Sequence, residues 1–348
     1  LYGLTTAVWL SAGHRKEYKM SALKKNFVSA GVPVGKAKAR HIGQGAYSVF
    51  RIIILLAIGF VILYPLLYMV STSLRSRASF MNSVRVWLPE KLDALTNYRV
   101  ALKALHYKDG LISSLKYEIV SAVLEIVSCA VAAYGFARFK FPFKKMFTAM
   151  LFLTILIPDT MIIIPRVVNN SQLDFLGILA LFNRLTGIDL RPNVLNTGLT
   201  FWLPSLLAAG LRSGILIFIY IQFFKGLPAE LEEVAWMDGA GPIRTFIRIA
   251  LPSSGVVILT VTVFSLIWHW NDYFLSSMYL TDGYPLAVWL TMMPKQLPTM
   301  GYSLVPSHPE TMAVLMAGCL VFILPMLIIY IFVQRWFIES IDRVGITG

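Results

Sequence analysis

The run TMAVLMAGCLVFILPMLIIYIFVQ, residues 311–334, contains no charged side chain. A helix needs roughly 20 predominantly apolar residues to cross about 30 Å of hydrocarbon, and this run is long enough. The composition of the whole chain also fits a lipid bilayer, because 57% of its residues are hydrophobic, 14% are charged and the mean hydropathy is +0.68. A soluble domain has a more polar composition. We therefore expect an all-α integral membrane protein.

Six apolar segments of this kind are separated by polar stretches or by stretches containing Pro and Gly. They cover residues 48–74, 112–137, 146–165, 199–224, 254–280 and 311–334. We predict six transmembrane helices in one domain, residues 48–337, with no room for a large soluble domain. No internal repeat is visible, so a secondary transporter built from inverted repeats gains no support.

The distribution of charge predicts the orientation of these helices. The net charge is +13, and between Arg15 and Arg51 the sequence holds many Lys and Arg residues but one acidic residue, Glu17. A basic stretch beside an apolar helix is typical of the cytoplasmic side of a membrane, so we expect a lipid bilayer as partner and no nucleic acid. Six crossings then put both the N-terminal segment, 1–47, and the tail, 338–348, in the cytoplasm. The basic stretch 75–116, taken alone, favours the opposite orientation.

The start of the chain and its two cysteines carry less information. The sequence begins with Leu1, and we expect the natural start at Met20, after an upstream extension. Residues 1–13 are too short to span a membrane and have no basic flank, so they make a poor signal peptide. Cys129 and Cys319 both lie in apolar runs, where a thiol behaves as a small hydrophobe.

A second stretch, KGLPAELEEVAWMDGAGPIRTFIRIALP at 225–252, predicts a helix, a sharp turn and another helix. Pro228 suits a first helical turn, where three glutamates would complement the helix dipole. Gly239 and Gly241 suggest positions with positive φ or close backbone approach, and Pro242 can begin the next helix. Apolar residues recur at helical spacing in both limbs, so we expect a hairpin that docks into a groove of another protein.

This stretch resembles the conserved cytoplasmic motif of ABC-importer permeases. The matching positions are Glu233, Ala235, Gly239, Ile249, Leu251 and Pro252, while Val234 replaces the family's middle Ala. Residues 48–337 as a whole resemble the maltose-type, six-span sugar permeases of that family. Features similar to that branch are Ala133-Tyr134, Ala137-Arg138-Phe139, Pro158 with Pro165, Leu195-Asn196-Thr197, Trp270-Asn271-Asp272 and Gln334-Arg335.

The resemblance implies a permease subunit, not an enzyme, in the plasma membrane of a bacterium. Its partners would be a second permease subunit, two cytoplasmic ATPase subunits and an extracellular solute-binding protein. The sequence has no Gly-rich phosphate loop followed by Lys and Ser or Thr, so ATP and Mg would bind to the ATPase chains and no cofactor to this one. We expect the coupling motif, 228–252, to contact the ATPase through Glu233, Ala235, Asp238, Gly239, Gly241, Ile249, Leu251 and Pro252.

Ionisable residues within the apolar segments are candidates for the solute pathway, because charge at membrane depth is costly and normally faces a cavity or a partner. Glu125, Asp159 and Arg212 are of this kind. An internal ion pair, for example between Glu125 and Arg212, is an equally good interpretation. Trp270, Asn271 and Asp272 offer a ring and polar groups to a sugar, although an interfacial or packing role is the alternative. His269 alone predicts no metal site.

The sequence thus favours a permease that forms half of a translocation pathway for a sugar or oligosaccharide. Another small solute, such as a glycerophosphodiester or a peptide, is an alternative within the same class. A secondary transporter or a membrane-embedded glycan enzyme would have no reason to carry an ATPase-docking hairpin. The stretch 168–192 is longer than the maltose-type branch usually shows, and its run Leu173 to Leu185 predicts a short helix ending near Gly187.

Overall fold

A computed structural model describes residues 34–76, 92–174 and 177–345, and within these residues the chain is helical and contains no strand. The expected start at Met20 and the basic residues up to position 33 lie outside the described residues. The chain divides into two units, 1–67 and 68–348. The part of α2 (Val34–Ser73) that belongs to the first unit exposes nearly all its apolar side chains between Val49 and Leu67, as a helix surrounded by hydrocarbon would.

Among the described residues, three helices are long and apolar enough to cross a membrane, and three bent helix pairs would raise the number to six if each pair is one span. The three long apolar stretches are Val49–Ser73, Tyr107–Arg138 and Pro309–Trp336. The second of these consists of α5 (Tyr107–Ser114), η1 (Leu115–Ile119) and α6 (Val120–Arg138), and the third lies in α18 (Pro309–Gly345). An all-helical membrane protein is therefore confirmed.

Breaks in the helices correct three predicted segments. The third predicted segment, 146–165, bends by 104° between α7 (Lys144–Leu156) and α8 (Asp159–Ser171), because Pro158 forces an extended backbone at Ile157. The fourth, 199–224, is two helices, α10 (Leu199–Leu206) and α11 (Ser213–Gly226), which are separated by a turn. The fifth, 254–280, is α15 (Gly255–Trp270) followed by α16 (Phe274–Tyr279).

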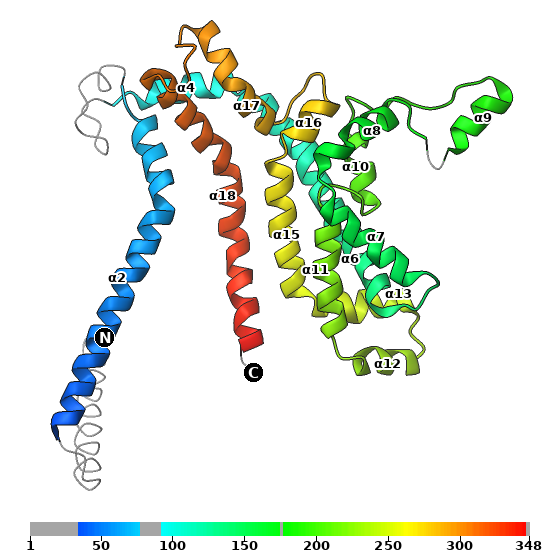
Figure 1. The fold of residues 1–348 in the computed structure, drawn as a ribbon, viewed down its shortest axis with the longest axis horizontal. Helices are drawn as coiled ribbons and strands as arrows, with labels where there is room; N and C mark the ends of the chain where they lie inside the picture. The colour runs from blue at the N-terminus through cyan, green and yellow to red at the C-terminus, as the bar shows by residue number, and fades with distance from the viewer. Residues whose placement is uncertain (1–33, 77–91, 175–176, 346–348) are drawn as a thin grey trace, which may run out of the picture. The chain divides into compact units, whose positions relative to one another are not determined.

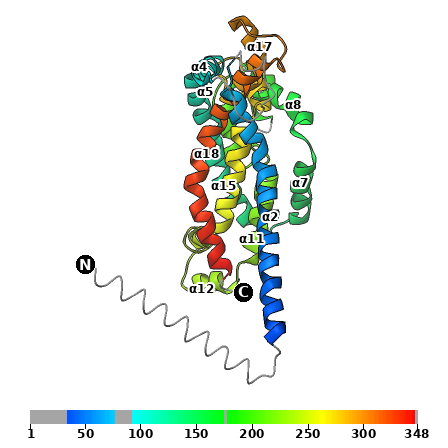
Figure 2. The same ribbon diagram turned by 90° about the vertical axis from the view of Figure 1, so that its left-hand side faces the viewer.

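In the larger unit, α6 packs against α10, α11 and α15 (Figure 1), and α15 in turn packs against α18 (Figure 2). Small residues on α6, Cys129, Ala130 and Ala133, allow the facing side chains of α11 to approach closely. In a second core, α4 (Ala94–Ala104) and α17 (Leu286–Gln296) pack on α18 around the buried Trp270 ring. The remaining elements are α9 (Ile178–Thr186), α12 (Glu230–Met237), α13 (Pro242–Thr245), η2 (Phe246–Ala250), α14 (Leu251–Ser253) and η3 (Leu297–Met300).

Candidate functional site

Two cavities open beside α8, α10 and α16 and share part of their walls. The larger has a volume of about 1090 Å³ and the smaller about 480 Å³. Both are lined by Arg166, Asp272 and the chain around Gly210. The larger also contains three of the predicted pathway residues, Asp159, Arg212 and Asn271. Four of the six predicted candidates therefore line one connected hollow.

The two basic groups in this wall already have partners. Asp159, the first residue of α8, forms an ion pair with Arg166, which lies about two turns further along the same helix. The distance between Asp159 Oδ1 and Arg166 Nη1 is 3.3 Å. Arg212 has a left-handed backbone, φ 56°, in the turn before α11. Its guanidinium lies over the ring of Trp268, 5.1 Å from the centroid. Such a contact stabilises a cation near a membrane without a second charge.

Glu125 is fully buried behind the cavity wall and joins three helices. Its carboxylate accepts a hydrogen bond from Ser213 at the start of α11, and a second, of 3.4 Å, from Ser265 on α15. His269 Nε2 lies 3.3 Å from the same carboxylate. No ion pair joins Glu125 to Arg212 among the described residues, so that interpretation of the two charges is wrong. Glu125 does face the space between the helices, as the free-energy cost of exposing a charge to lipid predicts.

Within Trp270-Asn271-Asp272, the three side chains have different surroundings. Trp270 is 2% exposed, packs on Phe322 and donates its indole N–H to the Phe322 carbonyl at 3.2 Å. This buried position favours the packing role over stacking on a solute. Asn271 is exposed to the larger cavity, and Asp272 lines both cavities while its Oδ1 accepts the N–H of Leu275.

Sequence reasoning missed a second buried carboxylate, Glu118, in the wall of the smaller cavity. Ser276 Oγ lies 2.8 Å from Glu118 Oε1 and 3.5 Å from Asp272 Oδ2, and its one proton can be donated to only one of them. The reason that singled out Glu125 applies equally to Glu118, since both lie in the second apolar segment. No Lys or Arg forms an ion pair with Glu118 or Asp272 in the part of the chain that the structure describes.

The predicted hairpin is present as α12, a tight turn and the helix that begins with Pro242. Its first limb starts at Glu230, two residues after Pro228, so the prediction for that proline is wrong. Gly239 has φ +79°, which confirms the expected left-handed turn. Gly241 has φ −74°, and a Cβ there would meet nothing within 4 Å. Gly241 therefore has neither the positive φ nor the close backbone approach that the sequence suggested.

The hairpin presents apolar and acidic groups on its outer surface. Glu233 and Asp238 are exposed, as are the large side chains of Leu231, Val234, Met237, Ile243 and Ile247. Ala235 instead faces inward, as does Ala250 of the second limb. Ile249 and Leu251 are half-buried and Pro252 is exposed. The outer face is thus mainly apolar, with acidic groups on the first limb and the exposed cations Arg244 and Arg248 on the second.

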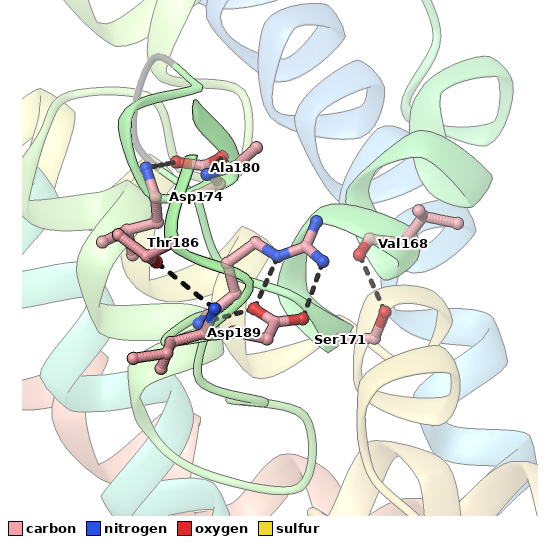
Figure 3. Close-up of polar contacts among 9 residues, drawn as sticks. Val168, Ser171, Asp174, Ala180, Thr186 and Asp189 are labelled. Carbon is pink, nitrogen blue, oxygen red and sulfur yellow. Dashed lines mark hydrogen bonds and ion pairs between the residues drawn. The ribbon is translucent and has the colours of Figure 1, made fainter. Parts of the chain in front are cut away.

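The long stretch after α8 contains the expected short helix, α9, which starts later than predicted and ends at the left-handed Gly187. The Asp174 carboxylate accepts the N–H groups of Leu179 and Ala180 at the start of this helix (Figure 3). Beyond it, Asp189 accepts two hydrogen bonds from the Arg191 guanidinium, of 2.8 and 2.7 Å, and these lower the pKa of Asp189 to about 2. No side chain of α9 is buried.

Comparisons with known proteins agree with this architecture. Residues 126–343 match the family described as binding-protein-dependent transport system inner membrane component. The osmoprotective compounds uptake permease protein of Synechocystis sp. is 26% identical over 83% of this chain and 89% of its own length. A probable starch degradation products transport system permease protein of Thermoanaerobacterium thermosulfurigenes is 25% identical over 73% and 81%. The sn-glycerol-3-phosphate transport system permease protein of Pectobacterium atrosepticum is 28% identical over 66% and 71%.

A solved structure has the same fold. It is described as the crystal structure of a bacterial ABC transporter involved in the import of the acidic polysaccharide alginate, and the matched chain superposes with a TM-score of 0.63 at 21% identity. The match covers 85% of this chain and 98% of that one. The family match spans well over half of the residues, across the central helices, both cavities and the hairpin. The chain therefore belongs to the binding-protein-dependent transport system inner membrane components, the permease subunits of ABC transporters, which are not enzymes.

Proposed function

We propose that this chain forms half of the pathway through which an ATP-driven importer takes up a neutral, hydroxyl-rich solute, a sugar or oligosaccharide. The chain would cross the bacterial plasma membrane six times, with residues 1–47 and 338–348 in the cytoplasm. Its partners would be a second permease, two ATPase subunits that bind ATP and Mg, and an extracellular solute-binding protein. The pathway residues would be those of the two cavities, with Glu125 and Trp270 supporting the wall from behind.

The charge of the cavity wall is the observation that carries the choice of solute. Asp159 pairs with Arg166, whereas Arg212 keeps its positive charge over the Trp268 ring. Glu118 and Asp272 remain without a basic partner among the described residues. Carboxylates accept hydrogen bonds from hydroxyl groups but repel a phosphate or a uronate. Together the two cavities are lined by two guanidinium groups and four carboxyl groups, so the wall has no excess of positive charge to hold an anion and favours a neutral sugar.

Aromatic rings near these carboxylates support the same solute. Phe201 and Tyr279 both line the smaller cavity, with their ring centroids 5.5 Å apart. An aromatic face beside hydrogen-bonding groups fits the apolar face and hydroxyl rim of a pyranose ring. The relatives described above include permeases named for starch degradation products and for sn-glycerol-3-phosphate. The acidic wall favours the first of these solute classes.

The hairpin would couple the pathway to the ATPase. Its exposed apolar side chains, with Glu233 and Asp238 on the first limb and Arg244 and Arg248 on the second, fit a groove that has an apolar floor and charges of both signs at its rim. The left-handed turn at Gly239 sets the angle between the two limbs and hence the shape of this surface. Residues 228–252 would therefore be the coupling element.

The solute assignment is tested with the complex purified from its native host together with its binding protein. We expect neutral saccharides to stimulate its ATPase activity in liposomes, and sn-glycerol-3-phosphate and peptides to leave it at the basal rate. The paired variant Glu118→Gln and Asp272→Asn should raise the solute concentration needed for half-maximal stimulation and leave the basal rate unchanged. Stimulation by sn-glycerol-3-phosphate or by a peptide, with none by any saccharide, would overturn the assignment.

A further inference from the structure

The last turn of α6 holds the hairpin at two points. Arg138, the final residue of α6, forms an ion pair with Glu232 of α12, with 2.9 Å between Nε and Oε1. The Arg138 side chain is 13% exposed and that of Glu232 is 5% exposed. Arg138 Nη2 also donates a hydrogen bond of 2.7 Å to the carbonyl of Leu227, in the link between α11 and α12. One guanidinium therefore binds the first limb of the hairpin and the segment that leads into it.

The second limb is held by Tyr134, one turn earlier on the same face of α6. Its ring lies 4.9 Å from that of Phe246 in the second limb and 5.5 Å from that of Phe224 near the end of α11. The hairpin is thus fastened to α6 through both limbs, by a buried ion pair on one and by an aromatic contact on the other.

The same helix carries the polar contacts beside the cavity. Glu125 is thirteen residues before Arg138, which places it about 20 Å further along α6. There it binds Ser213 of α11 and Ser265 of α15. A displacement of the hairpin would therefore move a rigid helix whose other contacts join the helices around the cavity.

We propose that Arg138 and Glu232 are the positioning pair that transmits movement of the hairpin to α6 and so to the solute cavity. This inference rests on the coupling role proposed above for residues 228–252. It assigns different tasks to two adjacent glutamates: Glu233 is exposed toward the ATPase, whereas Glu232 is turned inward to its own membrane helix. Charge pairs buried to this degree resist separation, because the loss of one partner leaves the other unpaired.

The test compares Arg138→Gln, Arg138→Lys, the exchanged pair Arg138→Glu with Glu232→Arg, and the control Lys140→Gln, an exposed cation two residues after Arg138 and outside the hairpin. Each is made in the full complex with a photo-crosslinking residue in place of the exposed Met237. Arg138→Gln should lower uptake per ATP hydrolysed by about tenfold or more while the cross-link to the ATPase persists. Arg138→Lys should retain part of the uptake, the exchanged pair should recover part of it, and the control should match the wild type.

Two outcomes would overturn the transmission role itself. One is normal uptake per ATP by Arg138→Gln, and the other is loss of its cross-link, because Arg138 would then shape the docking surface rather than transmit its movement. Failure of the exchanged pair to exceed Arg138→Gln would also contradict a direct ion pair. A wild-type complex that transports solute but forms no cross-link from position 237 would instead refute the docking role of the hairpin.

Discussion

Valine in place of Gly239 should impair coupling through the backbone alone. A Cβ added at this position would meet nothing within 4 Å, so the new side chain has room. The residue's φ of +79°, however, is a left-handed conformation that costs an L-residue about 1–2 kcal/mol, and a β-branched side chain is less tolerant than most. A change of that size alters the ratio of correctly formed to distorted hairpin by about 5- to 30-fold. We expect ATP-dependent uptake to fall by a similar factor.

Gly241 provides a matched control, since it lies two residues away in the same turn and a Cβ there also meets nothing within 4 Å. Its φ of −74° suits any residue, so Gly241→Val should transport like the wild type. Gly239→Asn should give intermediate uptake, because Asn tolerates the left-handed conformation. The assay is uptake into liposomes by purified complexes of verified subunit stoichiometry. Wild-type uptake by Gly239→Val, or an equal loss in Gly241→Val, would refute the reasoning.

Three further substitutions test other parts of the structure. Glu233→Ala should reduce uptake severalfold and leave the subunit stoichiometry intact. If Glu233 only interacts with the helix dipole, its loss costs about 0.3–1 kcal/mol of helix stability and uptake stays unchanged. Unchanged uptake would therefore exclude this carboxylate from the docking surface. Glu125→Ala should destabilise the purified complex by about 1–3 kcal/mol, because it leaves Ser213 and His269 without their buried partner. Glu125→Gln should keep a melting temperature close to that of the wild type. Equal melting temperatures of the wild type and both variants would contradict the cluster. Trp270→Ala should lower the melting temperature, because it removes a packed ring worth about 3–5 kcal/mol of stability. It should not change which solutes stimulate the ATPase. A changed solute preference would instead place Trp270 in the pathway.

The helical character and the hairpin could be predicted because both depend on local sequence. Apolar runs of about 20 residues have few folded forms other than a helix in lipid. Gly239 and Pro242 mark the turn, since one supplies positive φ and the other begins a helix. Gly241 shows the limit of this reasoning, because a glycine beside a turn can occupy an ordinary conformation.

The breaks within the predicted segments and the partners of the buried charges depend on tertiary contacts. Arg212 lies in an apolar run that reads as one helix, yet the helix is interrupted between Leu206 and Ser213, and the Arg212 guanidinium lies over Trp268. An ion pair with Arg212 is one of two interpretations that the sequence allows for Glu125, but hydroxyl groups from two other helices and an imidazole surround it instead. Residues so far apart in sequence have no periodicity that could reveal their contacts.

The most direct test of the account is accumulation of a labelled neutral saccharide by liposomes that contain the complete complex. The account predicts accumulation against a concentration gradient that requires both ATP and the binding protein, and that stops when the ATPase partners are inactivated. Arg138→Gln should reduce this accumulation, whereas the exposed control Lys140→Gln should not. Accumulation driven by a proton or sodium gradient without ATP would contradict the central claim that this permease is coupled to ATP hydrolysis.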